Sequence, residues 1–279
     1  MRQITELIRQ HYEHLSPSER RVAGFILDHL DDLATYNSVE LSEQCNTSKA
    51  TVSRLFRRLG YNSFKDMREE VRKLRQSGVP LPGNVGQQGV GLIERHLKSE
   101  ADNLQRLSVL FQNAQLQGFI AALADARQVG VIGFRNSYPV AMHLRQQLIQ
   151  VRPQVALLPQ PGQTLAEELV GYTPQDMIIL AGFHRRPRAF SHIIAGIREQ
   201  QVPLALLTET GSGLADCHPD WLFEIPLDSI SAFDSYALPM SLVSLISNLL
   251  LHHQLSQGRL RIEQINALYE VTQELDLNL

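Results

Sequence analysis

VELSEQCNTSKATVSRLFRRLGYNSF, residues Val39 to Phe64, decides how the N-terminal part of the chain folds. Leu41 and Cys45 are four residues apart, so they share one face of a helix. Asn46 opens a polar turn, because asparagine tolerates the left-handed backbone that a sharp turn needs. Ser48 ends the turn and is a good cap for a following helix. The stretch therefore predicts two short helices joined by a tight turn.

The second of these helices is predicted to start at Lys49 and to have one apolar and one basic face. Ser38 is placed to cap the first helix, and Gly60 is placed to end the second. At ~100° per residue, the apolar side chains fall together. They are Val52, Leu55, Phe56 and Leu59. The opposite, exposed side with its flanks holds Lys49, Ala50, Thr51, Ser53, Arg54, Arg57 and Arg58.

This basic face predicts a helix-turn-helix that docks on DNA. A recognition helix presents its N-terminal residues to base edges and its later cations to phosphates. The predicted base-contacting residues are Lys49, Ala50, Ser53 and Arg54, the predicted phosphate contacts are Arg57 and Arg58, and Ser48 and Thr51 complete the set. The alternative is an ordinary amphipathic helix with a solvated charged face. The paired helices, the short turn and the one-sided charge favour DNA.

The same residues carry a family resemblance. Ser48 to Arg54, then Leu59-Gly60-Tyr61 and Phe64, resemble the S-x-x-T-V-x-R…L-G-[YF]…F signature of the RpiR family of bacterial transcriptional regulators. The resemblance implies an N-terminal helix-turn-helix joined to a sugar-isomerase (SIS) domain, and it covers nearly the whole chain. In the turn, Asn46-Thr47 stands where the family usually has Gly-Val.

Composition is consistent with DNA contact at one end only. The net charge of the 279 residues is −3, but Lys49 to Arg75 holds nine Lys and Arg against three Asp and Glu. A basic segment on an acidic body predicts a local nucleic-acid interface. The two cysteines give no disulfide framework or zinc spacing, and no apolar run is long enough for a membrane span. We expect a cytoplasmic protein without metal or other cofactor.

The chain divides into three predicted regions. Residues 1–76 form an all-α helix-turn-helix domain, because helical patterns over 4–15 and from Pro17 onward precede the turn. Residues 77–91 are rich in glycine, proline and polar side chains and are predicted to be a linker. Residues 92–279 are predicted to be a SIS-like domain for effector binding and oligomerisation. The first helical stretch of this region, residues 92–127, packs on the rest of the domain or forms a dimer contact, and the sequence favours neither alternative.

The third region is predicted to be an α/β doubly wound parallel sheet. Short, almost wholly apolar runs alternate with amphipathic segments, a pattern typical of parallel strands covered on both faces. The runs are 129–134, 155–158, 177–183, 203–208 and 221–225. Ligands of such sheets bind beyond the carboxyl ends of the strands, so the loops there are the candidate sites.

The first such loop contains Arg135, Asn136 and Ser137. It resembles the G-x-G-x-S opening of SIS domains, with Arg135 in place of the second glycine. The second loop runs from Gly182 to Arg188 and contains His184, Arg185 and Arg186. SIS domains usually have S-x-S-G-x-T there, whose hydroxyls hold a sugar phosphate.

The second loop lacks those hydroxyls and offers guanidinium groups instead, which bind carboxylate and phosphate alike. A phosphosugar, a sugar acid and another organic acid all remain open as ligands. A solvated basic loop or a subunit salt-bridge site is the other interpretation. Thr208 is predicted to lie on the pocket rim, and Ser235 either reaches the ligand or, as favoured here, caps the next helix.

The sequence favours a bacterial DNA-binding transcriptional regulator whose DNA affinity or geometry is controlled by a small anionic metabolite. Expected partners are double-stranded DNA with a near-palindromic operator, the metabolite, and further copies in a homodimer or homotetramer, with no membrane. One alternative is a sugar-phosphate isomerase-type enzyme, although the sequence shows no convincing catalytic pair. Another is a DNA-binding protein with an inert dimerisation body.

Overall fold

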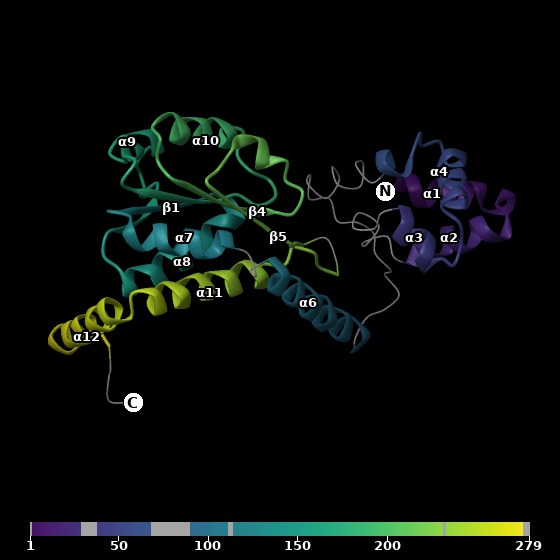
Figure 1. Ribbon diagram of the computed structural model, residues 1–279. Coiled ribbons are helices and arrows are strands. Elements are labelled where there is room, and N and C mark those ends of the chain that lie inside the picture. Colours follow the sequence, from purple (N-terminus) through teal and green to yellow (C-terminus); the bar gives the residue numbers. More distant parts are fainter. Residues whose placement is uncertain (1, 29–37, 68–89, 111–113, 231–232, 276–279) are drawn as a thin grey trace. The chain divides into compact units, whose positions relative to one another are not determined.

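The computed structural model describes residues 2–28, 38–67, 90–110, 114–230 and 233–275. The chain divides into two compact units. One comprises Met1–Ala101 with Asp228–Ser235, and the other comprises Asp102–Leu227 with Tyr236–Leu279. The predicted linker 77–91 lies almost wholly outside the described residues. Figure 1 labels the elements of both units.

The first unit is all-α in its described part, as predicted. Its elements are α1 (Arg2–His11), η1 (Tyr12–His14), α2 (Pro17–Asp28), α3 (Ser38–Gln44), α4 (Lys49–Arg58) and a short helical segment at 64–67. Helix α2 starts with a reciprocal cap, because the Ser16 amide donates to Glu19 Oε2 at 2.9 Å and the Glu19 amide donates to Ser16 Oγ at 3.3 Å. Pro17 occupies the first turn, where its missing N–H is no loss.

The apolar residues of this unit meet in one core. Ile4 and Ile8 of α1, Val22 and Ile26 of α2, Leu41 and Cys45 around α3, and the apolar face of α4 are all buried together. The predicted inward faces of α3 and α4 are therefore confirmed. Phe56 is fully buried and packs 5.0 Å, centroid to centroid, from the ring of Phe64. The core fixes α4 in place and leaves its other side to solvent.

Helix α6 (Val90–Leu110) begins within the last two residues of the predicted linker range, and α7 (Ala114–Asp125) leads into the sheet. Phe119, Ile120 and Leu123 of α7 are buried in the core beneath the sheet. Helix α7 therefore packs on the sheet domain. Four large apolar side chains of α6 are instead exposed: Leu92, Ile93, Leu97 and Leu104.

The second unit is built on a five-stranded parallel sheet of order β2-β1-β3-β4-β5. The strands are β1 (Val129–Gly133), β2 (Val155–Leu158), β3 (Met177–Ala181), β4 (Leu204–Glu209) and β5 (Trp221–Ile225). Each lies within a residue or two of the predicted range. In β1 and β3, Val129 is paired with Met177 and Gly133 with Ala181, so these strands end side by side.

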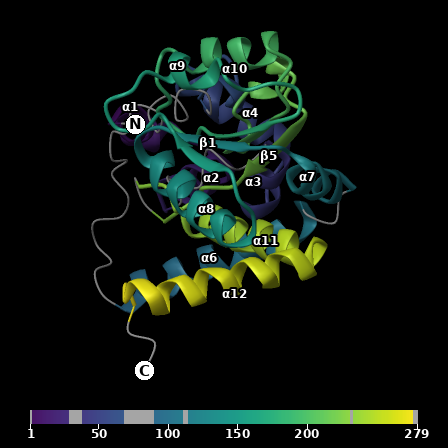
Figure 2. The same ribbon diagram turned by 90° about the vertical axis from the view of Figure 1, so that its left-hand side faces the viewer.

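Helices cover both faces of this sheet (Figures 1 and 2). Alternate strand residues pack on α7, α8 (Tyr138–Val151) and α11 (Ala237–His253) on one face. The others pack toward α9 (Leu165–Leu169) and α10 (Phe190–Glu199) on the opposite face. Two short 3-10 helices, η2 (Arg135–Ser137) and η3 (Leu214–Cys217), and the last helix, α12 (Leu255–Thr272), complete the unit. This is the doubly wound α/β fold that the sequence predicts.

The start of α11 and the length of the described helices bear on two of the predictions. The residue before α11 is Tyr236, whose side chain makes no cap bond, and capping by Ser235 stays a prediction. Among the described residues, no helix combines the length and the apolar content that crossing a bilayer requires.

Candidate functional site

The turn between α3 and α4 has the geometry that its sequence predicts. Asn46 has a φ of +47°, and the Thr47 amide donates to the carbonyl oxygen of Ser42 at 2.9 Å. Ser48 caps α4, because its Oγ accepts from the Thr51 amide at 3.2 Å. The turn is therefore held by backbone and side-chain bonds together, and the helix-turn-helix is confirmed.

The far end of α4 is closed by a glycine in the left-handed region. Gly60 has a φ of +91° and its amide donates to the carbonyl of Arg57 at 3.1 Å. The Tyr61 amide donates to the carbonyl of Phe56 at 2.9 Å, and the two rings meet edge to face at 6.4 Å. This is a Schellman motif with its apolar contact. It explains the Leu-Gly-Tyr sequence after the helix.

The outward side of α4 is basic. Lys49, Ala50, Arg54 and Arg57 are exposed, and Ser53 is half-buried. Arg54 lies along its own helix, because Nε donates to the Ala50 carbonyl and Nη2 to Thr51 Oγ1, both at 3.4 Å. These long bonds are weak, so the guanidinium remains able to turn toward a partner. The predicted base-contacting residues thus share one accessible face.

Two predicted DNA contacts have other roles in the structure. Thr51 is buried, and its hydroxyl lies 3.0 Å from Ser48 Oγ, so it belongs to the turn and not to the exposed face. Arg58 is half-exposed but donates to the His14 carbonyl and lies 3.5 Å from Glu19 Oε2. Burial acts to raise the pKa of Glu19, yet hydrogen bonds from Ser16 and the charge of Arg58 lower it overall. Arg58 therefore ties α4 to the start of α2.

The ligand loops of the body meet where the strand order reverses. The chain passes from β1 outward to β2 and then returns to β3 on the other side of β1. Helices leave the ends of β1 and β3 toward opposite faces of the sheet, which is where open α/β sheets form their binding crevice. The two loops in question are residues 134–137 after β1 and residues 182–189 after β3.

The loop after β1 approaches its neighbours closely. A Cβ at Gly133 would lie 2.6 Å from the carbonyl oxygen of Ser137, so only glycine fits there. Arg135 has a φ of +53° and is exposed, together with Asn136. Ser137 is buried, and its Oγ accepts from the Phe183 amide at 3.1 Å. Ser137 therefore ties the first loop to the second.

The loop after β3 turns one of its arginines inward. Arg186 Nη1 donates to the carbonyl of Gly182 at 3.0 Å, to Thr208 Oγ1 at 3.1 Å and to Glu209 Oε2 at 3.0 Å. Its guanidinium also lies over the ring of Phe190, 5.8 Å from the centroid. Thr208 and Glu209 are buried at the end of β4. Arg186 thus neutralises a buried carboxylate, and Thr208 lies beneath the loop instead of on an exposed rim.

The other arginines of the two loops face solvent. Arg185 and Arg188 are exposed, and Arg185 has a φ of +63°. Within the described residues, the side chains of Arg135, Arg185 and Arg188 make no hydrogen bond or ion pair. His184 is half-buried with Nε2 4.0 Å from Glu209 Oε1. The ends of β1 and β3 therefore carry three unneutralised guanidinium groups, two of them on residues with left-handed backbone.

Comparison with known proteins identifies the first unit. Residues 2–77 match the model of the helix-turn-helix domain of the rpiR family. YbbH of Bacillus subtilis, an uncharacterized HTH-type transcriptional regulator, is 25% identical over 223 residues, which cover 75% of this chain and 76% of the relative. The first unit therefore matches the helix-turn-helix domain of the rpiR family, and relatives that align over three quarters of the chain are HTH-type transcriptional regulators.

Solved structures extend the likeness to the fold of the body. The sugar isomerase domain of an RpiR transcription factor from Sphaerobacter thermophilus superposes with a TM-score of 0.59 at 20% identity, covering 64% of this chain and 99% of that one. Vibrio vulnificus NanR, solved in complex with ManNAc-6P, gives a TM-score of 0.58 at 20% identity and covers 96% of this chain and 98% of that one. The body of the chain therefore has the SIS-like fold.

The loops after β1 and β3 depart from the SIS pattern in a way that the backbone explains. Arg135 and Arg185 occupy the positions where the pattern has glycine, and both have a positive φ. At Gly182, where the pattern has serine, a Cβ would lie 1.9 Å from the ring of Phe190. Gly182 thus leaves the space that the Phe190 ring fills, and the two arginines have the positive φ that glycine favours.

Sequence reasoning missed the partner of Arg186. The sequence predicts a role for Thr208 at this strand end but none for Glu209, although an acidic residue that closes an apolar strand in this fold lies beside the loop of the neighbouring strand. Once the strand order is known, the position of Glu209 beside the loop after β3 predicts its pairing with Arg186. Ser235 belongs to the other compact unit by its contacts, and its predicted role at the ligand is a proposal only.

Proposed function

We propose that this RpiR-family regulator binds a small anionic metabolite in the crevice at the ends of β1 and β3, and that the metabolite changes how the protein binds DNA. The observation that carries the proposal is the set of exposed arginines, Arg135, Arg185 and Arg188, around that crevice. Like charges repel one another unless an anion joins them. A ligand with phosphate or carboxylate groups supplies that anion through charge-assisted hydrogen bonds.

Backbone conformation supports the same site. A residue other than glycine costs about 1–2 kcal/mol in the left-handed region, and Arg135 and Arg185 both adopt it. Strain of this kind concentrates at functional sites. NanR, which shares the fold, was solved with a phosphorylated sugar. A phosphosugar fits the crevice here, and because guanidinium groups replace hydroxyls, a sugar acid or another organic acid fits as well.

The DNA-binding half of the proposal rests on the exposed face of α4. Lys49, Ala50, Ser53 and Arg54 reach base edges in the major groove, and Arg57 contacts phosphate. Replacing Arg54 with alanine should weaken binding to operator DNA about 10-fold or more, because a bidentate contact to a base is worth about 1–3 kcal/mol. The chain's own upstream region is the DNA to use. If Arg54→Ala and Arg57→Ala both bind this DNA as tightly as the parent protein, the proposal that this face of α4 contacts DNA is refuted.

An isomerase would need a group in the crevice that is free to accept a proton. The buried carboxylate there, Glu209, is already paired with Arg186. The relatives that match three quarters of the chain are also transcriptional regulators. Regulation is therefore the function that the site supports best.

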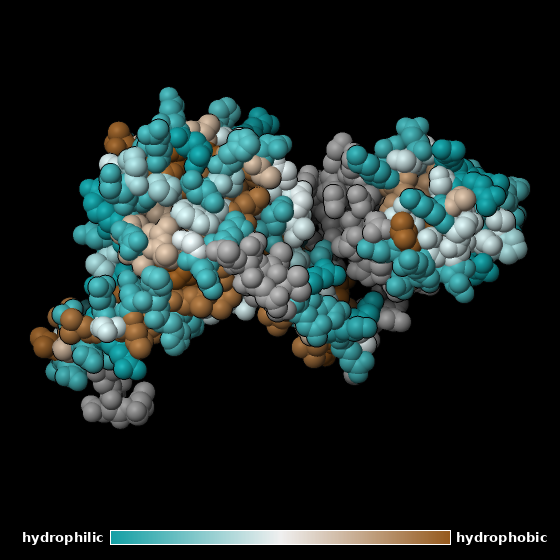
Figure 3. All heavy atoms as spheres, in the orientation of Figure 1, coloured by the Kyte–Doolittle hydropathy of each residue, from teal (hydrophilic) through white to brown (hydrophobic). Residues whose placement is uncertain are grey.

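Oligomerisation is part of the proposal. Apolar side chains on α12 are exposed on this chain, as the brown spheres around that helix in Figure 3 show. They are Leu260, Leu268, Val271 and, just beyond the helix, Leu275. Covering them with a second copy would give a homodimer or, through a second face, a homotetramer. Paired helix-turn-helix units read half-sites ~34 Å apart, so a near-palindromic operator is expected.

Ligand control is tested by measuring DNA affinity and melting temperature with a panel of phosphosugars, sugar acids and organic acids. A ligand that raises the melting temperature and shifts DNA affinity supports the proposal. If an acid raises the melting temperature but leaves DNA affinity unchanged, the protein binds the acid without any effect of that binding on its affinity for DNA. No response to any of them would leave the inert dimerisation body as the better account.

A further inference from the structure

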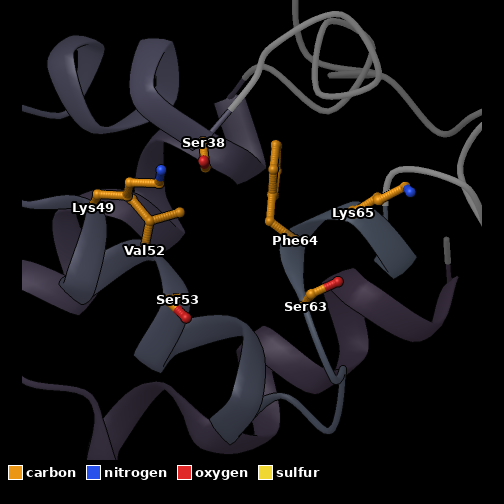
Figure 4. A pocket seen from close by; sticks show the side chains of 7 residues that line it. All are labelled: Ser38, Lys49, Val52, Ser53, Ser63, Phe64 and Lys65. Carbon is orange, nitrogen blue, oxygen red and sulfur yellow. The ribbon is translucent and has the colours of Figure 1, made fainter.

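A groove runs along one flank of α4. It has a volume of about 310 Å³, and Figure 4 shows side chains from three segments around it. Lys49, Val52 and Ser53 come from α4, Ser38 from the start of α3, and Ser63, Phe64 and Lys65 from the segment after the Schellman turn. All of them belong to the helix-turn-helix unit, so the groove is a feature of that unit alone.

The floor and the rim of the groove differ in chemistry. Val52 and Phe64 are buried and form an apolar floor. Lys49 and Lys65 stand on opposite walls, and both are exposed. No ion pair of either lysine occurs in the part of the chain that the structure describes. Hydroxyls of three serines complete the rim, so the groove offers two unneutralised ammonium groups and several hydrogen-bonding groups.

The opposite flank of α4 is different. There Arg58 is already paired with Glu19 and bonded to the His14 carbonyl. Cations available to an external anion therefore lie along the outward side of α4 and on the groove flank. Lys49 and Ser53 belong to both surfaces, which makes the groove continuous with the face that is proposed to read DNA.

We propose that this groove holds the sugar-phosphate backbone of the bound DNA, with Lys65 contacting a phosphate from the wall opposite Lys49 and Ser63 adding a hydroxyl contact. The inference rests on the proposed DNA-binding function and extends it to residues outside the recognition helix. Backbone contacts of this kind set the register of a protein on the duplex and come from lysine and serine side chains. Lys65 and Ser63 thereby determine how α4 is oriented in the major groove.

Ser63 allows a sharp test because its side chain has a known structural role. Its Oγ accepts from the Asp66 amide at 3.2 Å and so caps the short helical segment. Aspartate and asparagine cap helices about as well as serine. Ser63→Asp therefore keeps the cap but places a carboxylate in the groove, whereas Ser63→Asn keeps the cap without charge. Equal melting temperatures of the two full-length variants would verify that the fold is intact.

We expect Ser63→Asp to bind a labelled mixed-sequence duplex at least ~10-fold more weakly than Ser63→Asn at low salt, because a carboxylate beside a phosphate is repelled. The same ratio should appear on the chain's own upstream DNA, since phosphate contacts carry no sequence information. Equal affinities of the two variants would overturn the proposal.

Lys65→Gln provides an independent measurement. Loss of one phosphate contact should make the slope of log affinity against log salt less steep by ~0.9, equivalent to a ~3.5-fold change in the affinity ratio for a fourfold rise in salt. Arg9→Gln removes one exposed charge from the same unit, outside the groove, and serves as the control. An equal change of slope in Arg9→Gln, or none in Lys65→Gln, would refute the groove contact.

The two proposals fail in different ways. If Arg54→Ala abolishes preference for upstream DNA while Ser63→Asp and Lys65→Gln bind normally, the groove contact is wrong and the recognition face stands. If neither Arg54→Ala nor Arg57→Ala weakens binding, the proposed DNA face is itself wrong, whatever the groove variants show.

Discussion

Replacing Arg185 with glycine should make the body more stable and less responsive to its effector at the same time. The steric cost of the left-handed backbone at Arg185, φ +63°, is about 1–2 kcal/mol. Glycine removes that cost but loses about 0.5–1 kcal/mol through the greater freedom of the unfolded chain. The net gain in the free energy of unfolding is up to about 1.5 kcal/mol. For a unit of this size, that raises the melting temperature by up to about 3–6 °C.

Arg188→Gly is the matched control. Arg188 is exposed in the same loop, but its φ is not positive. Its replacement removes the same charge and relieves no strain, so it should lower the free energy of unfolding by about 0.5–1 kcal/mol. The two variants should therefore differ by about 1–2 kcal/mol in chemical denaturation followed by circular dichroism.

Effector binding should change in the opposite direction from stability. A hydrogen bond to a charged group contributes about 1.5–3 kcal/mol, so Arg185→Gly should weaken effector binding about 10- to 150-fold. Isothermal titration calorimetry with whichever acid raises the melting temperature of the parent protein measures this loss. A variant that is less stable than Arg188→Gly, or one that binds the effector as tightly as the parent, would refute the reasoning.

Three further results are expected in the body. Arg186→Ala should lower the free energy of unfolding by about 3–5 kcal/mol, since it leaves Glu209 buried without a counter-charge; the double variant with Glu209→Gln should recover part of this in urea denaturation. Gly182→Ala should cost about 1–3 kcal/mol, because the new methyl group collides with Phe190; a crystal structure or near-UV dichroism would show the displaced ring. Arg127 donates two hydrogen bonds to the buried Asp176 carboxyl and holds its pKa well below the usual value. The contribution of this pair to stability is therefore present above about pH 4 and is lost as pH falls below that. Asp176→Asn should flatten the acid side of a plot of melting temperature against pH.

Sequence alone predicted the parts of this protein that local pattern determines. Five apolar runs predicted the strands because parallel strands are buried on both faces, and the alternation of these runs with helices predicted the doubly wound sheet. The helix-turn-helix followed from the Asn46 turn and the Ser48 cap, both of which are local interactions. In each case the determining residues are close together in sequence.

The predictions that failed or changed depended on contacts between distant residues. Arg186 is inward because Glu209, 23 positions later, ends the neighbouring strand. Thr208 is buried for the same reason. Arg58 is partly engaged because Glu19 lies across the small core. No helical or strand periodicity encodes these pairings, since they arise only once the elements pack together.

A single helix connects the ligand crevice to the proposed oligomer surface. Helix α8 begins at Tyr138, directly after the loop that holds Arg135, and packs on α11 and α12 at its other end. There the Arg261 Nε donates to the Ile149 carbonyl at 2.8 Å, and Gly258 is buried where its missing side chain leaves room for Leu251 and Val151. A ligand can shift an equilibrium only through elements that differ between the two states. An anion that draws the β1 loop toward the β3 loop would displace the start of α8, and a packed helix transmits such a displacement along its length. If the proposed effector controls DNA binding through α12, Gly258 must remain small, because a Cβ there would lie 2.6 Å from Leu251 Cδ1. Gly258→Leu should then leave effector affinity unchanged in calorimetry and remove the effector-dependent change in DNA affinity.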